Sequence, residues 1–238
     1  MNQCDLFAGI GGFSLAASWY GIKTTQMIEI DPFCQQILKR NFPEVPIHDD
    51  ITTYNPRLGE FDIITAGFPC QDASECNPHG RGLEGERTGL FYQALRVACE
   101  VRPRFLLLEN VPALLGRGFG RILGSLARNG FDAEWCCLRA SEMGAPHARK
   151  RLFVIAYPIG TGTSRTGGPQ TRTNQTLIGG DSWWRQNPSP PSTIRALDAR
   201  FSSRLARQQL KVLGNTVVPQ CAAVAYQRIL EINNSFEG

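Results

Sequence analysis

The fold is decided by residues 4–17, which read CDLFAGIGGFSLAA. An apolar run that contains Asp5 comes first, three of the next four residues are glycine, and a second apolar run follows. This order predicts a strand over residues 4–8, a tight turn, and a helix that begins near Phe13. Backbone N–H groups in such a turn can approach a ligand at the helix N-terminus, although one glycine-rich turn is weak evidence for a ligand.

The next apolar run, residues 24–30, ends in acidic residues. Nucleotide-binding βαβ units hold ribose hydroxyls with an acidic side chain about 20 residues after the glycine turn, where Glu29 stands here. We therefore expect a cofactor that contains a nucleoside. The alternative, open for Asp31 in particular, is that Glu29 and Asp31 cap the helix predicted over residues 32–40.

Three further strand ends carry polar side chains. Residues 61–66 form an apolar run that leads through Gly67 to Cys70, residues 105–108 lead to Glu109, and a short strand end precedes Asp50. Ligands in open parallel sheets bind at the carboxyl ends of the strands, so Cys70 is a candidate nucleophile and Glu109 a candidate acid. A buried structural thiol and a glutamate bonded to loop backbone are the alternatives.

The composition predicts one main globular domain. The chain has 238 residues, 42% of them hydrophobic, and it contains neither a basic leader nor an apolar span of about 18 residues. We expect a cytoplasmic protein without a membrane segment. The eight cysteines lack paired Cys-x-x-Cys spacing, so we expect neither a metal site nor disulfides.

Charge is unevenly distributed along the chain. Residues 1–138 carry 12 Lys and Arg against 16 Asp and Glu, whereas residues 139–211 carry 12 against 3. An acidic body with an arginine-rich segment suits a catalytic core that offers one face to a polyanion, and nucleic acid is the leading candidate. The alternative is a solubilising surface, although such surfaces normally mix both signs of charge.

Five short motifs, taken in their order along the chain, resemble those of the cytosine-5 DNA methyltransferase family. They are DLFAGIGGF (5–13), GFPCQ (67–71), ENV (109–111), HARKR (147–151) and GNTVVP (214–219). Three features depart from the family pattern. His147 stands where Gln is usual, Asp72 and Ala73 replace a pair such as Pro-Phe, and the region between Tyr157 and Arg195 is much shorter than the usual target-recognition domain.

The resemblance implies an α/β fold, a Rossmann-like sheet of the kind found in S-adenosylmethionine-dependent methyltransferases, with a small irregular recognition region. We expect a catalytic and cofactor-binding domain over residues 1–157 and a short target-recognition region over 158–195. Residues 196–238 are expected to form a basic segment and a C-terminal helix that returns to the catalytic domain.

The resemblance also implies a reaction. Cys70 would add as a thiolate to carbon 6 of a cytosine flipped out of the DNA duplex. A protonated Glu109 would neutralise the negative charge that this addition builds toward ring nitrogen 3. Arg149 and Arg151, which alternate on one predicted strand face, would bind the base carbonyl oxygen, orient Glu109 or support the covalent intermediate. The methyl donor would be S-adenosyl-L-methionine, which leaves as S-adenosyl-L-homocysteine.

The binding residues are carried over from the same motifs or chosen from the polar side chains near them. The expected cofactor contacts are Phe7, Gly9, Gly11, Gly12, Glu29, Ile30, Asp50, Ile51, Pro69, Leu90, Asn215 and Val217. The expected DNA contacts are Gln71, Ser74, Arg81, Arg165, Arg172 and Arg185. The partners expected are double-stranded DNA and a cognate restriction endonuclease, with the enzyme a monomer encoded by a bacterium or phage.

Three other functions compete with this one. A tRNA cytosine methyltransferase would use the same active-site residues, but the Cys-Phe-Thr marker of that branch does not occur in the recognition region. A non-catalytic DNA-binding subunit would not need Cys70, Glu109 and Arg149 together. A dinucleotide oxidoreductase would explain the glycine turn but neither the cysteine motif nor the glutamate motif.

Overall fold

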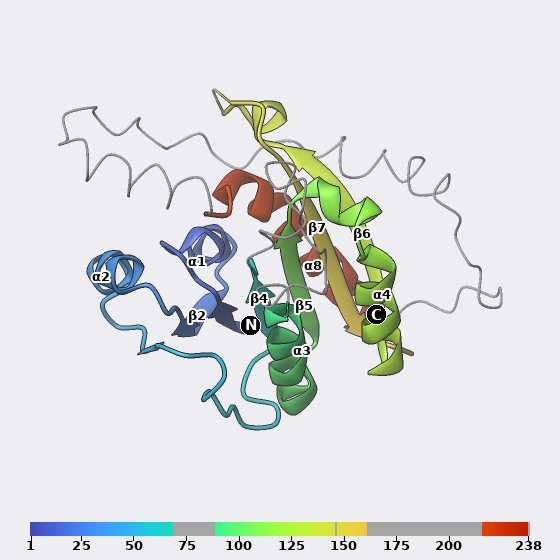
Figure 1. Ribbon diagram of the computed structural model, residues 1–238, viewed down its shortest axis with the longest axis horizontal. Coiled ribbons are helices and arrows are strands. Elements are labelled where there is room, and N and C mark those ends of the chain that lie inside the picture. Colours follow the sequence, from blue (N-terminus) through green and yellow to red (C-terminus); the bar gives the residue numbers. More distant parts are fainter. Residues whose placement is uncertain (69–88, 146, 161–215, 238) are drawn as a thin grey trace.

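The computed structural model of the protein describes residues 1–68, 89–145, 147–160 and 216–237. Within these residues a seven-stranded sheet has the strand order β3-β2-β1-β4-β5-β7-β6 (Figure 1). The strands are β1 (Asn2–Leu6), β2 (Lys23–Ile28), β3 (Ile47–His48), β4 (Ile63–Ala66), β5 (Phe105–Asn110), β6 (Phe131–Arg139) and β7 (Lys150–Pro158).

The sheet is mostly parallel, which confirms the predicted α/β class. Strands β1 to β5 run in one direction, and β7 lies antiparallel between β5 and β6. Because β7 runs against β5, the start of β7 lies beside the end of β5, where Asn110 pairs with Leu152. The β6–β7 hairpin therefore brings its arginines to the edge of the sheet where the parallel strands end.

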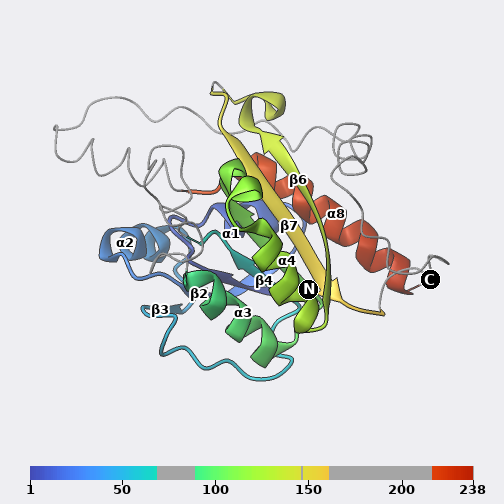
Figure 2. The same ribbon diagram turned by 45° about the vertical axis from the view of Figure 1, so that its right-hand side comes forward.

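Helices cover both faces of the sheet (Figure 2). They are α1 (Gly12–Ser18), α2 (Pro32–Asn41), α3 (Leu90–Val101), α4 (Phe119–Arg128) and α8 (Pro219–Glu237), with short 3₁₀ turns η2 (Pro112–Gly116) and η3 (Ala140–Met143). Helices α1 and α8 pack with Phe105 and Leu107 of β5, whereas α3 and α4 pack with Leu106 and Leu108. A strand buried on both faces needs a continuous apolar run, which explains residues 105–108. None of the described helices is long and apolar enough to cross a membrane.

The last helix returns to the first strand and the glycine turn. A Cβ atom at Gly12 would collide with the carbonyl oxygen of Val217, so the segment that leads into α8 needs glycine there. Tyr226 of α8 donates a buried hydrogen bond of 2.6 Å to Oε1 of Gln3 in β1, across 223 residues of sequence. These contacts join the C-terminal helix to β1 and to the glycine turn that follows it.

Candidate functional site

The turn after β1 is held in a backbone conformation that few residues adopt. Phe7 and Gly9 both have a φ of 56°, and Gly11, the N-cap of α1, has a φ of 90°. The predicted strand over residues 4–8 was too long, because a left-handed Phe7 cannot continue a strand and β1 ends at Leu6. A large side chain in this conformation costs free energy and is characteristic of functional turns.

Glu29, directly after β2, is joined to this turn. Its Oε2 accepts a 2.7 Å hydrogen bond from the Gly9 N–H, and its Oε1 accepts one of 2.8 Å from the Asp31 N–H. Burial raises the pKa of Glu29. Each carboxylate oxygen can accept a second hydrogen bond, so Glu29 still has capacity for the hydroxyls of a ligand.

The neighbours of Glu29 have different roles. Asp31 is the N-cap of α2 and accepts a 2.8 Å bond from the Phe33 N–H, which confirms the capping alternative for this residue. Ile30, between Glu29 and Asp31, leaves 70% of its surface exposed. An exposed apolar side chain between a carboxylate and a helix cap suits contact with a flat ring.

A third carboxylate follows β3. Asp50 accepts hydrogen bonds of 2.8 Å from both the N–H and the hydroxyl of Thr52, and these bonds lower the pKa of Asp50. Both bonds use Oδ1. Ile51, the next residue, is buried, and Phe7 and Leu90 pack against the same apolar cluster. Since β1, β2 and β3 are neighbours, their three loops lie in a row along one edge of the sheet.

Glu109 lies at the end of β5 in a buried position. Its side chain is 6% exposed, and its Oε1 lies 3.0 Å from Nε of Arg151. Burial raises the pKa of Glu109 to about 7, against the opposing charges of Arg151 and Arg149. Its Oε2 faces the backbone of Gly67, 3.6 Å from the position a Cβ would take there. The carboxyl group therefore points to the segment that leads to Cys70.

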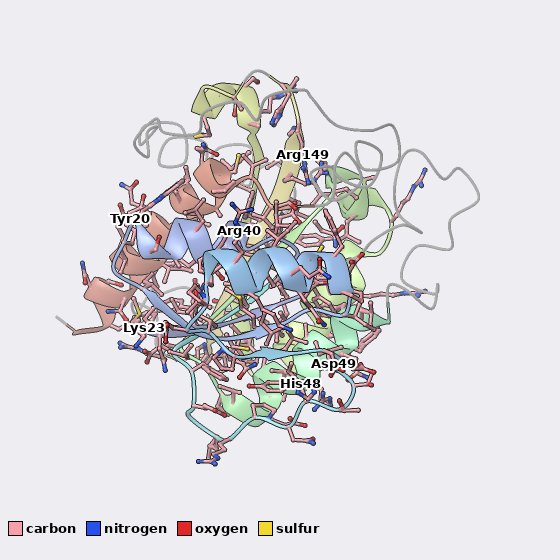
Figure 3. All side chains as sticks on the ribbon, turned by 90° about the vertical axis from the view of Figure 1, so that its left-hand side faces the viewer. Tyr20, Lys23, Arg40, His48, Asp49 and Arg149 are labelled. Atoms are coloured by element: carbon pink, nitrogen blue, oxygen red, sulfur yellow. The ribbon has the colours of Figure 1, made fainter. Side chains whose placement is uncertain are left out.

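The two arginines come from the β6–β7 hairpin. Arg151 is the second residue of β7, whereas Arg149 precedes the strand and its carbonyl accepts a 2.8 Å hydrogen bond from the Ala140 N–H. Figure 3 shows Lys23, where β2 begins, on one side of the molecule, with Arg149 and Asp49 toward the other. The hairpin arginines and the loop of Asp50 thus belong to the same edge of the sheet.

Two polar residues that sequence reasoning did not select also hold this edge. Asn110 donates a 3.1 Å hydrogen bond from Nδ2 to the Phe68 carbonyl, and Asp5 accepts bonds of 2.7 Å and 2.8 Å from the hydroxyls of Ser14 and Thr65. Both are buried. The sequence did carry signals for them, since Asn110 is part of the glutamate motif and Asp5 interrupts an apolar strand.

The remaining predicted residues divide into two groups. Val217 contacts the backbone of both Gly12 and Gly67, and its neighbour Thr216 lies beside Gly9, so these two residues of the last motif lie between the glycine turn and the end of β4. The other predicted residues lie outside the described part of the chain. They are Pro69, Cys70, Gln71, Ser74, Arg81, Arg165, Arg172, Arg185 and Asn215.

Sequence comparison finds relatives for most of this chain. The profile of the C-5 cytosine-specific DNA methylase family matches residues 1–182. The type II methyltransferase M.DsaV of Dactylococcopsis salina is 34% identical over 157 residues, which are 64% of this chain and 44% of that protein. M.HhaI of Haemophilus parahaemolyticus is 32% identical over 158 residues, 64% of this chain and 48% of that protein. The match thus spans less than half of these relatives.

Solved structures show the same fold. A prophage-encoded protein of E. coli, assigned as a DNA modification methyltransferase, superposes with a TM-score of 0.57 at 28% identity, covering 66% of this chain and 47% of that one. The Dnmt2 methyltransferase of S. pombe superposes with a TM-score of 0.54 at 21% identity, covering 66% and 49%. The second likeness, at its low identity, concerns the fold alone.

Proposed function

Because the chain belongs to the C-5 cytosine-specific DNA methylase family, we propose that it transfers a methyl group from S-adenosylmethionine to carbon 5 of cytosine in double-stranded DNA. The observation that carries the proposal is the buried carboxyl group of Glu109 at the end of β5, which is paired with the half-buried Arg151 and directed to the segment that leads to Cys70. The family's catalytic motifs supply the chemistry, and the fold brings the described ones to one edge of the sheet.

Cys70 is the proposed nucleophile. Carbon 5 of cytosine reacts poorly until a thiolate adds to carbon 6 and shifts electron density across the ring. Asn110 holds the Phe68 carbonyl at 3.1 Å. Two peptide units separate Phe68 from Cys70, which limits the distance between their Cα atoms to about 8 Å. This limit supports a thiol near Glu109.

Glu109 is the proposed acid. A glutamic acid with a pKa of about 7 is partly protonated at neutral pH, so it can donate a proton to ring nitrogen 3 while the thiolate adds. The carboxylate left behind is stabilised by Arg151, 3.0 Å away. Once carbon 5 carries the methyl group, the same carboxylate can take the proton back, and water removes the proton from carbon 5 as the thiolate leaves.

The edge formed by β1, β2 and β3 fits the methyl donor, which when bound supplies an electrophilic methyl group on a sulfonium. Glu29 would accept from the ribose hydroxyls, and Oδ2 of Asp50 would accept from the adenine amino group. Phe7 and the exposed Ile30 would contact the two faces of the adenine ring. The polar and apolar groups at this edge thus match the chemistry of an adenosine.

The substrate is proposed from charge and from the family. Residues 139–211 carry 12 Lys and Arg against 3 Asp and Glu, a composition that suits the binding of phosphates. A base inside a duplex exposes neither ring face, so the cytosine must be flipped out. The recognition region is short, and we propose a target of roughly two to four base pairs. We further propose a monomeric cytoplasmic enzyme. A cognate restriction endonuclease is proposed from the names of the relatives, which are type II methyltransferases.

The test measures methyl transfer with radiolabelled S-adenosylmethionine, using duplex DNA and tRNA as substrates for the purified protein. We expect labelled DNA, bisulfite-resistant cytosines and unlabelled tRNA. The variant Cys70→Ala should lose methyl transfer yet still bind S-adenosylhomocysteine. The control variant Cys99→Ala, which replaces a half-buried cysteine of α3, should keep full activity. Label in tRNA alone would indicate a tRNA cytosine methyltransferase instead. Binding of cofactor and DNA without methyl transfer would indicate a non-catalytic DNA-binding subunit.

A further inference from the structure

Arg96, in the middle of α3, joins this helix to the loop after β3. Its Nη2 donates hydrogen bonds of 2.7 Å to the Ile51 carbonyl and 3.1 Å to the Tyr54 carbonyl. Its other donors are used within α3, where Nε donates to Oε1 of Gln93 at 2.9 Å and Nη1 lies 3.0 Å from both carboxylate oxygens of Glu100. The guanidinium is thus oriented by its own helix and directed at the loop.

The loop that Arg96 contacts carries two of the proposed cofactor residues. It forms a turn in which the Thr53 N–H donates to the Asp50 carbonyl and the Tyr54 N–H to the Ile51 carbonyl, at 3.1 Å and 3.3 Å. The side chains of Ile51 and Tyr54 are buried against the cluster that includes α3. These apolar contacts hold the loop against the core, but they are not directional. The orientation of the loop therefore depends on hydrogen bonds.

We propose that Arg96 is a positioning residue for S-adenosylmethionine, which fixes the Asp50–Ile51 loop without contacting the cofactor. This inference rests on the proposed function of the same edge. Five N–H donors in a rigid plane allow one arginine to hold two loop carbonyls while its own helix holds the guanidinium. A lysine ammonium group offers three donors around one atom, so it cannot bond the loop carbonyls and the side chains of its own helix at the same time.

A merely structural role for Arg96 predicts a different result from a positioning role. If Arg96 only ties α3 to the sheet, its loss lowers the melting temperature and affects every step equally. If it positions the loop, its loss weakens cofactor binding specifically, because Asp50 must meet the adenine amino group within hydrogen-bond distance. Hydrogen bonds from a charged group are strong enough that we expect about tenfold weaker cofactor binding without Arg96.

A matched control exists on the other face of the sheet. Arg228 of α8 makes a bidentate pair with Glu134 of β6, at 2.7 Å and 3.1 Å. The side chains of Arg96 and Arg228 are equally exposed, at 30% each. Arg228→Ala therefore removes a comparable arginine that lies away from the cofactor edge.

The experiment compares Arg96→Ala, Arg96→Lys and Arg228→Ala with the wild type by calorimetric titration of S-adenosylhomocysteine and by steady-state kinetics. For Arg96→Ala we expect the Kd for S-adenosylhomocysteine and the KM for S-adenosylmethionine to rise about tenfold. The KM for DNA and kcat at saturating cofactor should stay within about twofold. Arg96→Lys should show an intermediate loss, and Arg228→Ala should leave cofactor binding unchanged.

Several outcomes would overturn the inference. These are unchanged cofactor affinity in Arg96→Ala, or in Arg96→Lys if the alanine variant does not fold, and an equal loss of affinity in Arg228→Ala. A wild type that binds S-adenosylhomocysteine without methylating DNA would refute the proposed function, while the calorimetric comparison would still decide the role of Arg96. A wild type that binds no S-adenosylhomocysteine would refute both.

Discussion

Replacing Glu109 by Gln is the sharpest test of the proposed chemistry, because the amide keeps the shape of the side chain but cannot donate an acidic proton. General acid catalysis contributes about 10²–10⁴-fold to a rate, and we expect the methyl-transfer rate to fall within that range. The rate should be measured as a single turnover with saturating cofactor and a hemimethylated duplex, so that product release does not hide the chemical step.

Folding should survive this substitution, because two opposing effects are similar in size. Burial raises the pKa of Glu109 from 4.5 to about 7, so keeping it ionised at alkaline pH costs the folded state on the order of 3 kcal/mol. Gln removes that cost, which already includes the attraction to Arg151, but the amide nitrogen that it introduces finds no acceptor on Arg151, a loss of about 1–3 kcal/mol. The melting temperature should therefore change by less than about 5 °C.

The pH profile provides a second measurement of the same group. Because Glu109 must be protonated to act as an acid, the wild-type rate should fall as pH rises through about 7. The residual rate of Glu109→Gln should lack this alkaline limb. A rate loss smaller than about tenfold, or an alkaline limb that persists in the variant, would show that Glu109 is structural.

Three further perturbations test other parts of the site. Wild-type protein should form a covalent adduct with DNA containing 5-fluorocytosine, because fluorine blocks the final elimination, and Cys70→Ala should form none; denaturing gels distinguish the two. Arg149→Ala and Arg151→Ala should each lower the rate of methyl transfer. In the double variant the loss should be smaller than the sum of the two, because both arginines act on Glu109, and a fully additive loss would indicate independent roles. Burial raises the pKa of Asp5 from 3.8 to about 7, so its stabilisation is complete at low pH and is lost as pH rises through about 7. The free energy of unfolding of the wild type, measured with urea, should decrease between pH 6 and pH 8, and in Asp5→Asn this decrease should be smaller by about 1 kcal/mol. An equal decrease in both proteins would mean that Asp5 does not titrate between pH 6 and pH 8.

The sequence alone determined the features that depend on neighbouring residues. The apolar run over residues 105–108 predicted a strand that leads to Glu109, and Asp31 followed by Pro32 predicted the start of α2, because apolar runs and capping act within a few residues. The motifs also placed Glu109 at a strand end and Glu29 beside the glycine turn. They could not show that Phe7 leaves the strand, since a left-handed φ at a large residue has no local signal.

Only the tertiary structure decided which of these residues meet. The pKa of Glu109 depends on burial and on Arg151, which reaches it because β7 runs antiparallel to β5, and no periodic pattern encodes the direction of a strand. The contact of Val217 with Gly12 and Gly67 joins the end of the described chain to its beginning. Arg96 illustrates the limit most clearly, because Glu100 four residues on gives it the pattern of an ordinary surface ion pair. Its bonds to Ile51 and Tyr54 exist only because folding brings segments more than 40 residues apart into contact, at separations of 45 and 42 residues.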